Sequence, residues 1–220
     1  MINAKTFRSF IISLLVATTA HAESPLRGLY ISADAFGYLY PLFVKDKYYS
    51  SEVSATLNIC NRFFPTVEIG FGHTDMVSQL YEIGYNTRAP YYRIGMDYNM
   101  QYKSNKPGYI FLGGRMGYTS FNYSIEAPPL TDPIWGDEAP IQFTDVPCRA
   151  IWAEAVGGIR AEITRNIHMG WSLRYKYPLH RGPIANGGPW YVPGFGTGKR
   201  GVLGATYTIS YYFNFTKKKQ

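Results

Sequence analysis

The 220-residue sequence predicts an all-β protein, an eight-stranded antiparallel up-and-down transmembrane β-barrel with short periplasmic turns and long extracellular loops. Three observations predict this fold. Charged residues make up only 17% of the chain, against about 25% in soluble domains, while aromatic residues also reach 17%. Eight segments alternate apolar and polar residues with the period of a strand. The connections between these segments are alternately short and long.

The composition also excludes other classes of protein. Glycine (22 residues) and tyrosine (20 residues) are poor helix formers, so a helical bundle is not expected. An apolar content of 46% is too high for a disordered chain. No nucleic-acid-binding motif is present, and the mildly basic net charge suits anionic lipid better.

The first element predicted along the chain is a cleaved secretory signal over residues 1–22. Lys5 and Arg8 precede a short apolar run, and the small residues around Ala22 suit cleavage after that position. The run is too short for a membrane anchor, which needs about 20 residues.

Removal of the signal leaves two parts, a β-barrel domain over 23–216 and a basic periplasmic tail over 217–220. Because the signal carries two basic residues and no acidic one, the formal net charge falls from +7 to +5. Lysines of the tail supply three of the remaining positive charges, so the barrel itself is only modestly basic.

Eight predicted strands follow the signal. In one of them, Val53 and Ala55 lie on one face while Glu52 and Ser54 lie on the other. The strands are expected at residues 28–36, 52–60, 66–73, 91–100, 109–118, 149–163, 167–176 and 201–215. Each is near the 9–11 residues that cross a bilayer at a tilt.

The lengths of the connections separate a membrane barrel from a soluble sandwich or a lipocalin-like barrel. Short turns are expected after the strands that end near residues 60, 102 and 163. Long loops are expected at about 37–50, 74–90, 119–147 and 177–200. Short turns at one end and long loops at the other are typical of bacterial outer-membrane barrels, whereas a sandwich has no reason to segregate them.

The polar faces of the strands carry ionised residues of both signs. Charges facing lipid would each cost about 2–4 kcal/mol near the midplane, so these faces are expected to point inward. The predicted interior ionic network contains Glu52, Glu68, Arg93, Asp97, Arg115, Glu154, Arg160, Glu162 and Arg174. Mutual pairing of these charges is expected, with a narrow gated conduit as the alternative.

Tyrosines crowd the predicted strand ends, as in the aromatic girdles of membrane barrels. Those near the boundaries are Tyr91, Tyr92, Tyr98, Tyr102, Tyr109, Tyr118, Tyr175, Tyr177, Tyr211 and Tyr212. The last strand, Y-T-I-S-Y-Y-F-N-F, resembles the C-terminal insertion signal of bacterial barrel proteins, although a short basic tail follows it.

The alternation, the segregated connections and the C-terminal strand together resemble the small eight-stranded outer-membrane barrels of the OmpA, OmpX and OmpW types, and most of all the small barrels of Bacteroidetes-type bacteria. The resemblance covers 23–216. It implies an integral protein of the outer membrane of a Gram-negative cell, in contact with outer-membrane lipid and lipopolysaccharide and with other outer-membrane proteins.

The expected function is non-enzymatic, that of a structural or accessory subunit of an outer-membrane complex for barrel assembly or uptake, which contacts its partners by its loops or by the barrel wall. No catalytic, cofactor or metal site is expected, because the histidines lie in separate segments without metal-ligand spacing. A porin-like small-solute pore is one alternative. The other is a lipid A-modifying enzyme, because the stretch from Arg174 to His180 is faintly similar to a lipid A deacylase barrel, although Gly182 replaces the serine that such an enzyme requires.

Aromatic residues in the long loops are candidates for partner contact, or for a lid over the barrel mouth. They are Trp135, Trp190, Tyr191 and Phe195. Loops of this length carry function more often than they merely connect strands.

Two cysteines, Cys60 and Cys148, are expected at opposite ends of the barrel. A disulfide cannot bridge a membrane height of roughly 25 Å, so both are predicted to be free.

Overall fold

A computed structural model of the chain describes residues 25–35, 37, 48–78, 82–104, 107–131, 138–182, 188–198 and 200–215. The predicted signal over 1–22 and the predicted tail over 217–220 lie outside the described residues. In the described part, no helix is long and apolar enough to cross a bilayer.

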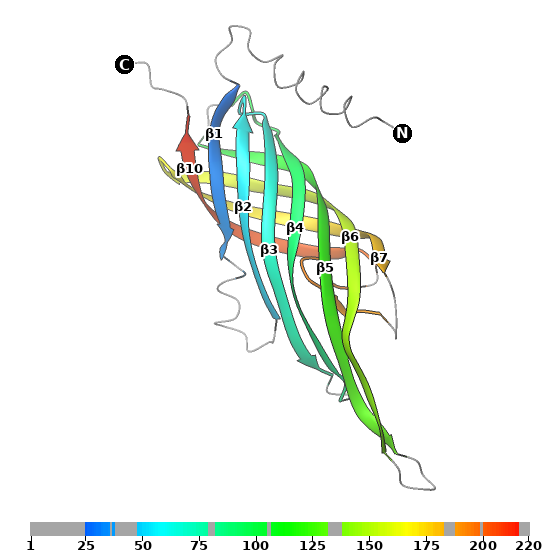
Figure 1. The fold of residues 1–220 in the computed structure, drawn as a ribbon. Helices are drawn as coiled ribbons and strands as arrows, with labels where there is room; N and C mark the ends of the chain where they lie inside the picture. The colour runs from blue at the N-terminus through cyan, green and yellow to red at the C-terminus, as the bar shows by residue number, and fades with distance from the viewer. Residues whose placement is uncertain are drawn as a thin grey trace, which may run out of the picture.

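Eight long antiparallel strands form the wall of a closed barrel (Figure 1). They are β1 (Leu26–Asp34), β2 (Tyr48–Ile59), β3 (Phe63–Val77), β4 (Gly84–Asn99), β5 (Gly108–Thr131), β6 (Glu138–Thr164), β7 (Ile167–Gly182) and β10 (Val202–Asn214). Each strand pairs with its neighbour in sequence, and β1 pairs with β10 to close the ring. The predicted eight-stranded up-and-down topology is therefore confirmed.

Several strands are longer than the sequence pattern indicated. β5 and β6 contain 24 and 27 residues and stay paired from Gly108↔Ala161 to Thr131↔Glu138. Most of the segment 119–147, expected to be a loop, is therefore strand. Its outer part, from Glu126↔Gln142 to Thr131↔Glu138, begins at the last β4 pair and forms a hairpin arm that projects beyond the rest of the wall (Figure 1). The expected loop 74–90 is likewise shortened, because β3 and β4 pair out to Val77↔Gly84. Alternation weakens beyond the barrel wall, because neighbouring residues of the arm such as Pro128 and Pro129 are both exposed.

Apolar side chains cover the outside of the barrel. Ile94, Leu173 and Leu203 expose 64%, 69% and 78% of their surfaces, although they are strongly apolar. The interior holds the polar faces instead, including Glu68, which is only 2% exposed, and Arg93, which is only 4% exposed. The distribution is the reverse of that in a soluble protein, whose apolar side chains are mostly buried.

Glycines on the inner face make room for large side chains of the neighbouring strand. Gly117 lies opposite Trp152, and Gly70 lies opposite Tyr91. A Cβ atom at Gly117 would overlap the Trp152 indole, and one at Gly70 would overlap the Tyr91 phenol ring. Each large residue thus lies over a glycine, which lets a narrow barrel be filled by side chains.

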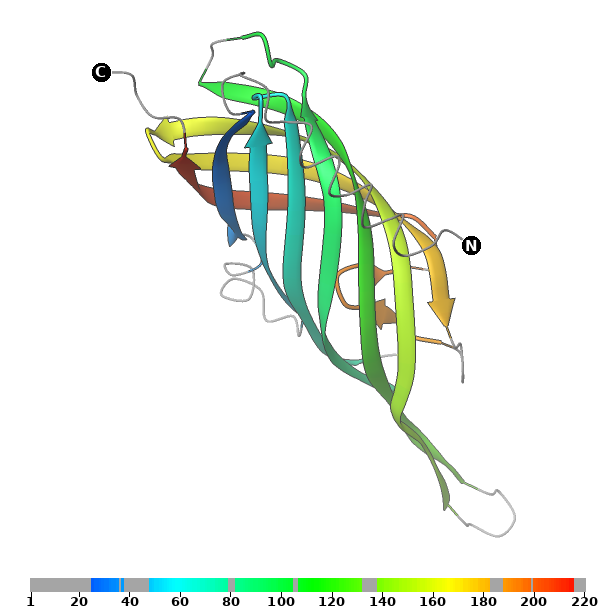
Figure 2. The ribbon, with the colours of Figure 1, turned by 45° about the horizontal axis from the view of Figure 1, so that its top comes forward.

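A small additional hairpin lies in the mouth of the barrel. It consists of β8 (Tyr191–Val192) and β9 (Gly196–Thr197), between β7 and β10 in sequence (Figure 2). Tyr191 and Val192 are 7% and 1% exposed. The expected loop 177–200 therefore includes the end of β7 and a folded plug.

Candidate functional site

An ion-pair network occupies the middle of the barrel interior. Glu68 lies at its centre and accepts hydrogen bonds from Arg93 at 3.0 Å, Arg115 at 3.0 Å and Arg174 at 2.7 Å. The three arginines are bridged further by acids on other strands. These ion pairs are Arg93–Glu52, Arg93–Glu154, Arg115–Asp97, Arg174–Glu52 and Arg174–Glu154.

The strand register brings these charges together. Glu68 and Arg93 are directly opposite on β3 and β4, and Arg115 and Glu154 are opposite on β5 and β6. Period-two alternation turns every one of these side chains inward. Arg174 comes from β7 on the other side of the ring, so the network connects strands across the lumen as well as along the wall.

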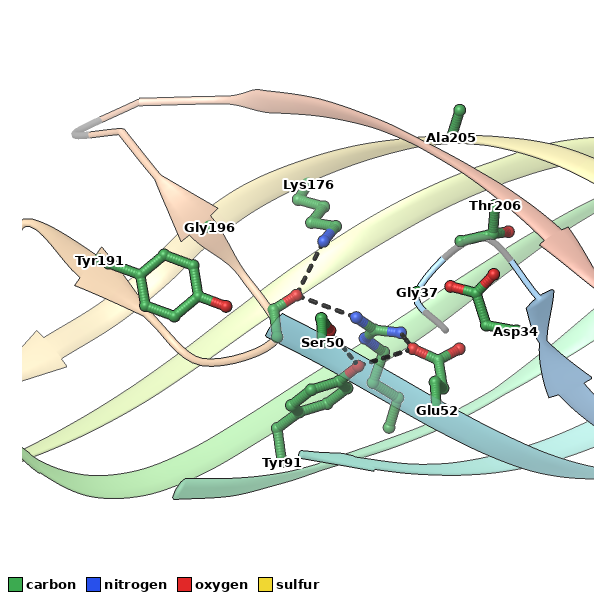
Figure 3. A pocket seen from close by; sticks show the side chains of 12 residues that line it. Asp34, Gly37, Ser50, Glu52, Tyr91, Lys176, Tyr191, Gly196, Ala205 and Thr206 are labelled. Atoms are coloured by element: carbon green, nitrogen blue, oxygen red, sulfur yellow. Dashed lines mark hydrogen bonds and ion pairs between the residues drawn. The ribbon is translucent and has the colours of Figure 1, made fainter. Parts of the chain in front are cut away.

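The plug hairpin is anchored on this network through one carbonyl group. The oxygen of Gly194 accepts hydrogen bonds from Arg93 Nη2 at 2.9 Å and from Lys176 Nζ at 2.7 Å (Figure 3). Gly194 has φ +78° and sits against the Tyr91 ring, where a Cβ atom would clash. Tyr91 in turn donates its hydroxyl to Glu52 at 3.0 Å.

With Lys176 included, the network has four cations and four carboxylates. Such a balance is expected of buried charges, because an unpaired charge in a low-dielectric interior is strongly unfavourable. Lys176 supplies the fourth positive charge to the set formed by Arg93, Arg115 and Arg174.

Aromatic and apolar side chains fill the barrel on the long-loop side of the network. Trp152 is 1% exposed and donates its indole N–H to Glu154 at 2.6 Å. Tyr85 donates to the carbonyl oxygen of Tyr191 in the hairpin at 2.7 Å. The cluster comprises Tyr85, Ala89, Tyr91, Phe121, Tyr123, Ile125, Cys148, Ala150, Trp152, Tyr191, Val192 and Phe195. The hairpin therefore completes a small hydrophobic core within the mouth.

A second aromatic layer lies at the short-turn end. The guanidinium of Arg160 lies 4.6 Å from the ring centre of Tyr30 and donates to the hydroxyl of Tyr109 at 3.1 Å. The Tyr109 ring stacks on Phe64, with a centroid distance of 5.0 Å. The imidazole of His168 packs edge-on against Tyr30. The interior thus has three layers, with aromatic layers above and below the ion pairs.

The structure brings together seven of the nine residues predicted for the ionic network. Arg160 points into the lower aromatic layer instead, and Glu162 is exposed at the short-turn end. Both residues stand at the alternate positions of β6 that were predicted to face inward. They lie too far along β6 to reach the charged residues of the ion-pair network.

The loop aromatics are placed differently from one another. Trp135 lies outside the described residues. Trp190 is 37% exposed and stacks on Tyr85, whereas Tyr191 and Phe195 are buried within the plug. Of the two roles considered for these residues, the geometry of Tyr191 and Phe195 matches the lid.

Two features of the site were not predicted. Alternation places Lys176 on the inward polar face beside Arg174, but no sequence pattern marks its contact with a backbone carbonyl. Tyr91 was assigned to the girdle and faces the interior, as do Tyr109 and Tyr212. The sequence does hold a signal for this orientation. Each of these tyrosines alternates with outward-facing neighbours, such as Tyr92, which is 49% exposed, so each belongs to the inward face.

The described cavities of the interior are small. One of about 240 Å³ lies beside the hairpin between Glu52, Lys176 and Thr206 (Figure 3). Cavities of about 20 Å³ in the ionic layer and about 110 Å³ at the short-turn end are separate from it. Within the part of the chain that is described, no three histidine, cysteine or acidic residues are arranged to hold a metal ion.

The two cysteines lie where the strand order predicts. Cys60 is exposed in the turn after β2, and Cys148 is buried in β6 toward the long-loop end; both are free.

A family model described as a domain of unknown function, DUF6048, matches residues 11–218. The chain belongs to the DUF6048 family. No curated protein matches this DUF6048 chain. The family description assigns no activity.

Several solved structures are similar to this DUF6048 protein. Neisserial surface protein A has 13% identity and a TM-score of 0.41, covering 86% of this chain and 94% of its own. Ail, the attachment invasion locus protein of Yersinia pestis, has 8% identity and a TM-score of 0.41, covering 86% and 95%. A major outer membrane protein from Thermus thermophilus has 12% identity and a TM-score of 0.43, covering 86% and 98%.

Proposed function

We propose that this protein is a non-enzymatic integral outer-membrane β-barrel, closed to solutes, that serves as a structural or accessory subunit of an outer-membrane protein complex. The observation that carries the proposal is the inverted polarity of the barrel. Its exterior is apolar, while an ion-pair network is buried inside. In water the exposed apolar wall would be unfavourable, whereas in a bilayer it contacts lipid.

The height of the apolar exterior fits a bilayer. On β7 the outward side chains are Ile167, Met169, Trp171, Leu173, Tyr175, Tyr177 and Leu179. Twelve residue steps at about 3.3 Å give about 40 Å along the strand. At a tilt of about 45° this corresponds to a height of roughly 28 Å, close to the hydrocarbon thickness.

A heat-modifiability gel tests the membrane barrel. The mature protein, refolded in detergent, is expected to migrate faster unheated than boiled, because a closed hydrogen-bonded barrel resists the detergent at room temperature. Identical migration of the two samples would refute the barrel.

The packed interior supports a closed barrel. The ionic layer joins β2, β3, β4, β5, β6 and β7 by side-chain contacts, and the hairpin lies on top of it. Planar-bilayer recordings are expected to show no stepwise conductance. Reproducible conductance steps would favour the small-solute pore.

The positions of the histidines argue against lipid hydrolysis. His168 lies among aromatic rings at the short-turn end, and Ser172 on the same strand is hydrogen-bonded to Thr206 at 2.6 Å. His180 is exposed at the opposite end of β7. Incubation with lipid A is expected to leave its acylation unchanged by mass spectrometry; a released acyl chain would favour the enzyme.

The hairpin arm supports the accessory role. The pairing of β6 with β7 ends at Arg149↔Gly182, and the pairing of β5 with β4 ends at Gly84↔Glu126, so beyond these residues β5 and β6 pair only with each other. The arm thus extends beyond the wall on the long-loop side, which is extracellular in bacterial barrels. Such an arm is a natural contact surface for another protein.

Site-specific photocrosslinking in cells can locate the partner contact. A crosslinking residue at Gln142, exposed on the arm, is expected to give an adduct with a distinct protein. The comparison is the same crosslinking residue placed at Leu173, which is exposed on the apolar wall. An adduct at Leu173 alone would assign the contact to the wall. Absence of adducts at both, together with migration as a monomer in mild detergent, would refute the accessory role.

A further inference from the structure

The apolar exterior ends at a common border on five neighbouring strands, β3 to β7. The first polar side chains beyond it are His73, Arg88, Ser120, Arg149 and His180. His73 is paired with Arg88 across β3 and β4, and Ser120 is paired with Arg149 across β5 and β6. Four of these five residues carry a basic group; we call His73, Arg88, Arg149 and His180 the basic rim.

Within the described residues, the arginines of the basic rim have no carboxylate partner. Arg88 and Arg149 are both exposed, and the guanidinium of Arg88 lies 5.0 Å over the ring of Phe71. Among the described residues, neither forms an ion pair with an acid. The interior arginines behave differently, because Arg93, Arg115 and Arg174 are all paired. Among the described residues, Arg88 and Arg149 therefore give the basic rim a positive surface without a neutralising acid, at the edge of the apolar band.

An exterior groove of about 730 Å³ lies on this border between β5, β6 and β7. Arg149, His180 and Ser120 supply polar groups to its lining, and Tyr118 and Ile151 supply apolar surface. A volume of roughly two dozen water molecules is too large for a single phosphate and suits a headgroup of sugar size. The groove thus has a polar part and an apolar part, at the level where lipid headgroups meet acyl chains.

We propose that the basic rim and this groove bind the phosphorylated sugar headgroup of a glycolipid in the outer leaflet. Arg149 and His180 contact phosphate, while Tyr118 and Ile151 contact the first carbons of the acyl chains. The inference rests on the proposed outer-membrane barrel, which sets this border at the outer surface. Guanidinium groups suit phosphate because they donate several hydrogen bonds in a planar fork.

Native mass spectrometry of the full mature protein in detergent tests the proposal. The probes are bisphosphorylated lipid A, its dephosphorylated form and phosphatidylglycerol. Bisphosphorylated lipid A is expected to bind most tightly. Arg149→Gln is expected to weaken that binding about fivefold and Arg88→Gln/Arg149→Gln roughly twentyfold, since a basic residue near an anionic surface contributes about 1 kcal/mol. Arg165→Gln, which removes an exposed charge from a short turn, is the matched control and should bind like wild type.

Each alternative outcome is distinct. Equal binding of phosphatidylglycerol and lipid A would overturn the assignment to a glycolipid. Equal loss with Arg165→Gln would overturn the basic rim as the site, and so would unchanged binding in the double variant. Complete competition by millimolar inorganic phosphate would mean that the groove binds a free anion. The wild type and every variant are first checked for the heat-dependent gel shift. If the wild type shows no shift, the proposed barrel is refuted. If the wild type shows a normal shift but no preference among the lipids, only this inference is refuted.

Discussion

Replacement of Glu68 by glutamine is expected to destabilise the barrel strongly. Glu68 is 2% exposed and accepts hydrogen bonds from three arginines. Glutamine keeps the shape but removes the charge, leaving one buried positive charge in excess. Removal of one partner from a buried ion pair costs about 3–5 kcal/mol. The equilibrium constant for unfolding should therefore rise by a factor of roughly 10² to 10⁴, since each 1.4 kcal/mol is tenfold.

Urea unfolding in detergent micelles, followed by tryptophan fluorescence and by the gel shift, measures this loss. The control is Glu126→Gln on the exposed arm, where the carboxylate accepts a side-chain hydrogen bond from Gln142 at 3.0 Å. It should change the free energy of unfolding by less than about 0.5 kcal/mol. In the double variant Glu68→Gln/Arg174→Gln, the loss should fall short of the sum of the single losses by at least about 1 kcal/mol. A loss below about 1 kcal/mol for Glu68→Gln would refute the view that the ionic layer holds the barrel together.

Three further predictions concern the packing. Gly117→Ala should lower the free energy of unfolding by about 1–3 kcal/mol, because the added methyl group overlaps the Trp152 indole. The control is Gly114→Ala, where the nearest atom to the added methyl group is the Glu154 carbonyl oxygen at 3.7 Å, an ordinary contact. Equal urea midpoints for the two variants would contradict the packing of Trp152 over Gly117. Gly194→Ala places a side chain at a residue with φ +78° and against the Tyr91 ring. Limited proteolysis should therefore cut the hairpin faster, while the barrel still shows its heat-dependent gel shift. An unchanged cleavage rate would argue against a plug anchored at Gly194. In the folded protein a maleimide should label exposed Cys60 but not buried Cys148, and both after unfolding; rapid labelling of Cys148 in the folded state would contradict its burial.

The barrel was predictable because lipid and a packed polar interior impose opposite demands on alternate residues. Glu68, Arg93, Arg115 and Glu154 could be assigned to the interior from parity alone, since a strand has only two faces. Parity does not say how far along the barrel a residue lies. Parity alone therefore assigns Glu162 to the network, although β6 carries it to the short-turn end.

The plug hairpin and the arm could not be predicted from the alternation of residues, for two different reasons. The hairpin is held through the carbonyl oxygen of Gly194, and backbone groups leave no signature in residue types. On the arm the consecutive residues Pro128 and Pro129 are both exposed, so alternation no longer distinguishes strand from loop. The bulge near Asp145, which has φ +53°, further breaks the period of two.

The place of the hairpin in the chain has a consequence for biogenesis. The hairpin precedes β10, and β10 forms the final seam with β1 through the pairs from Gly28↔Asn214 to Asp34↔Thr208. An open sheet of β1 to β7 can therefore receive the hairpin on its concave side before the two chain ends meet. Closure of the seam between β1 and β10 then encloses a hairpin that is already in place, so the barrel can be filled before it is sealed.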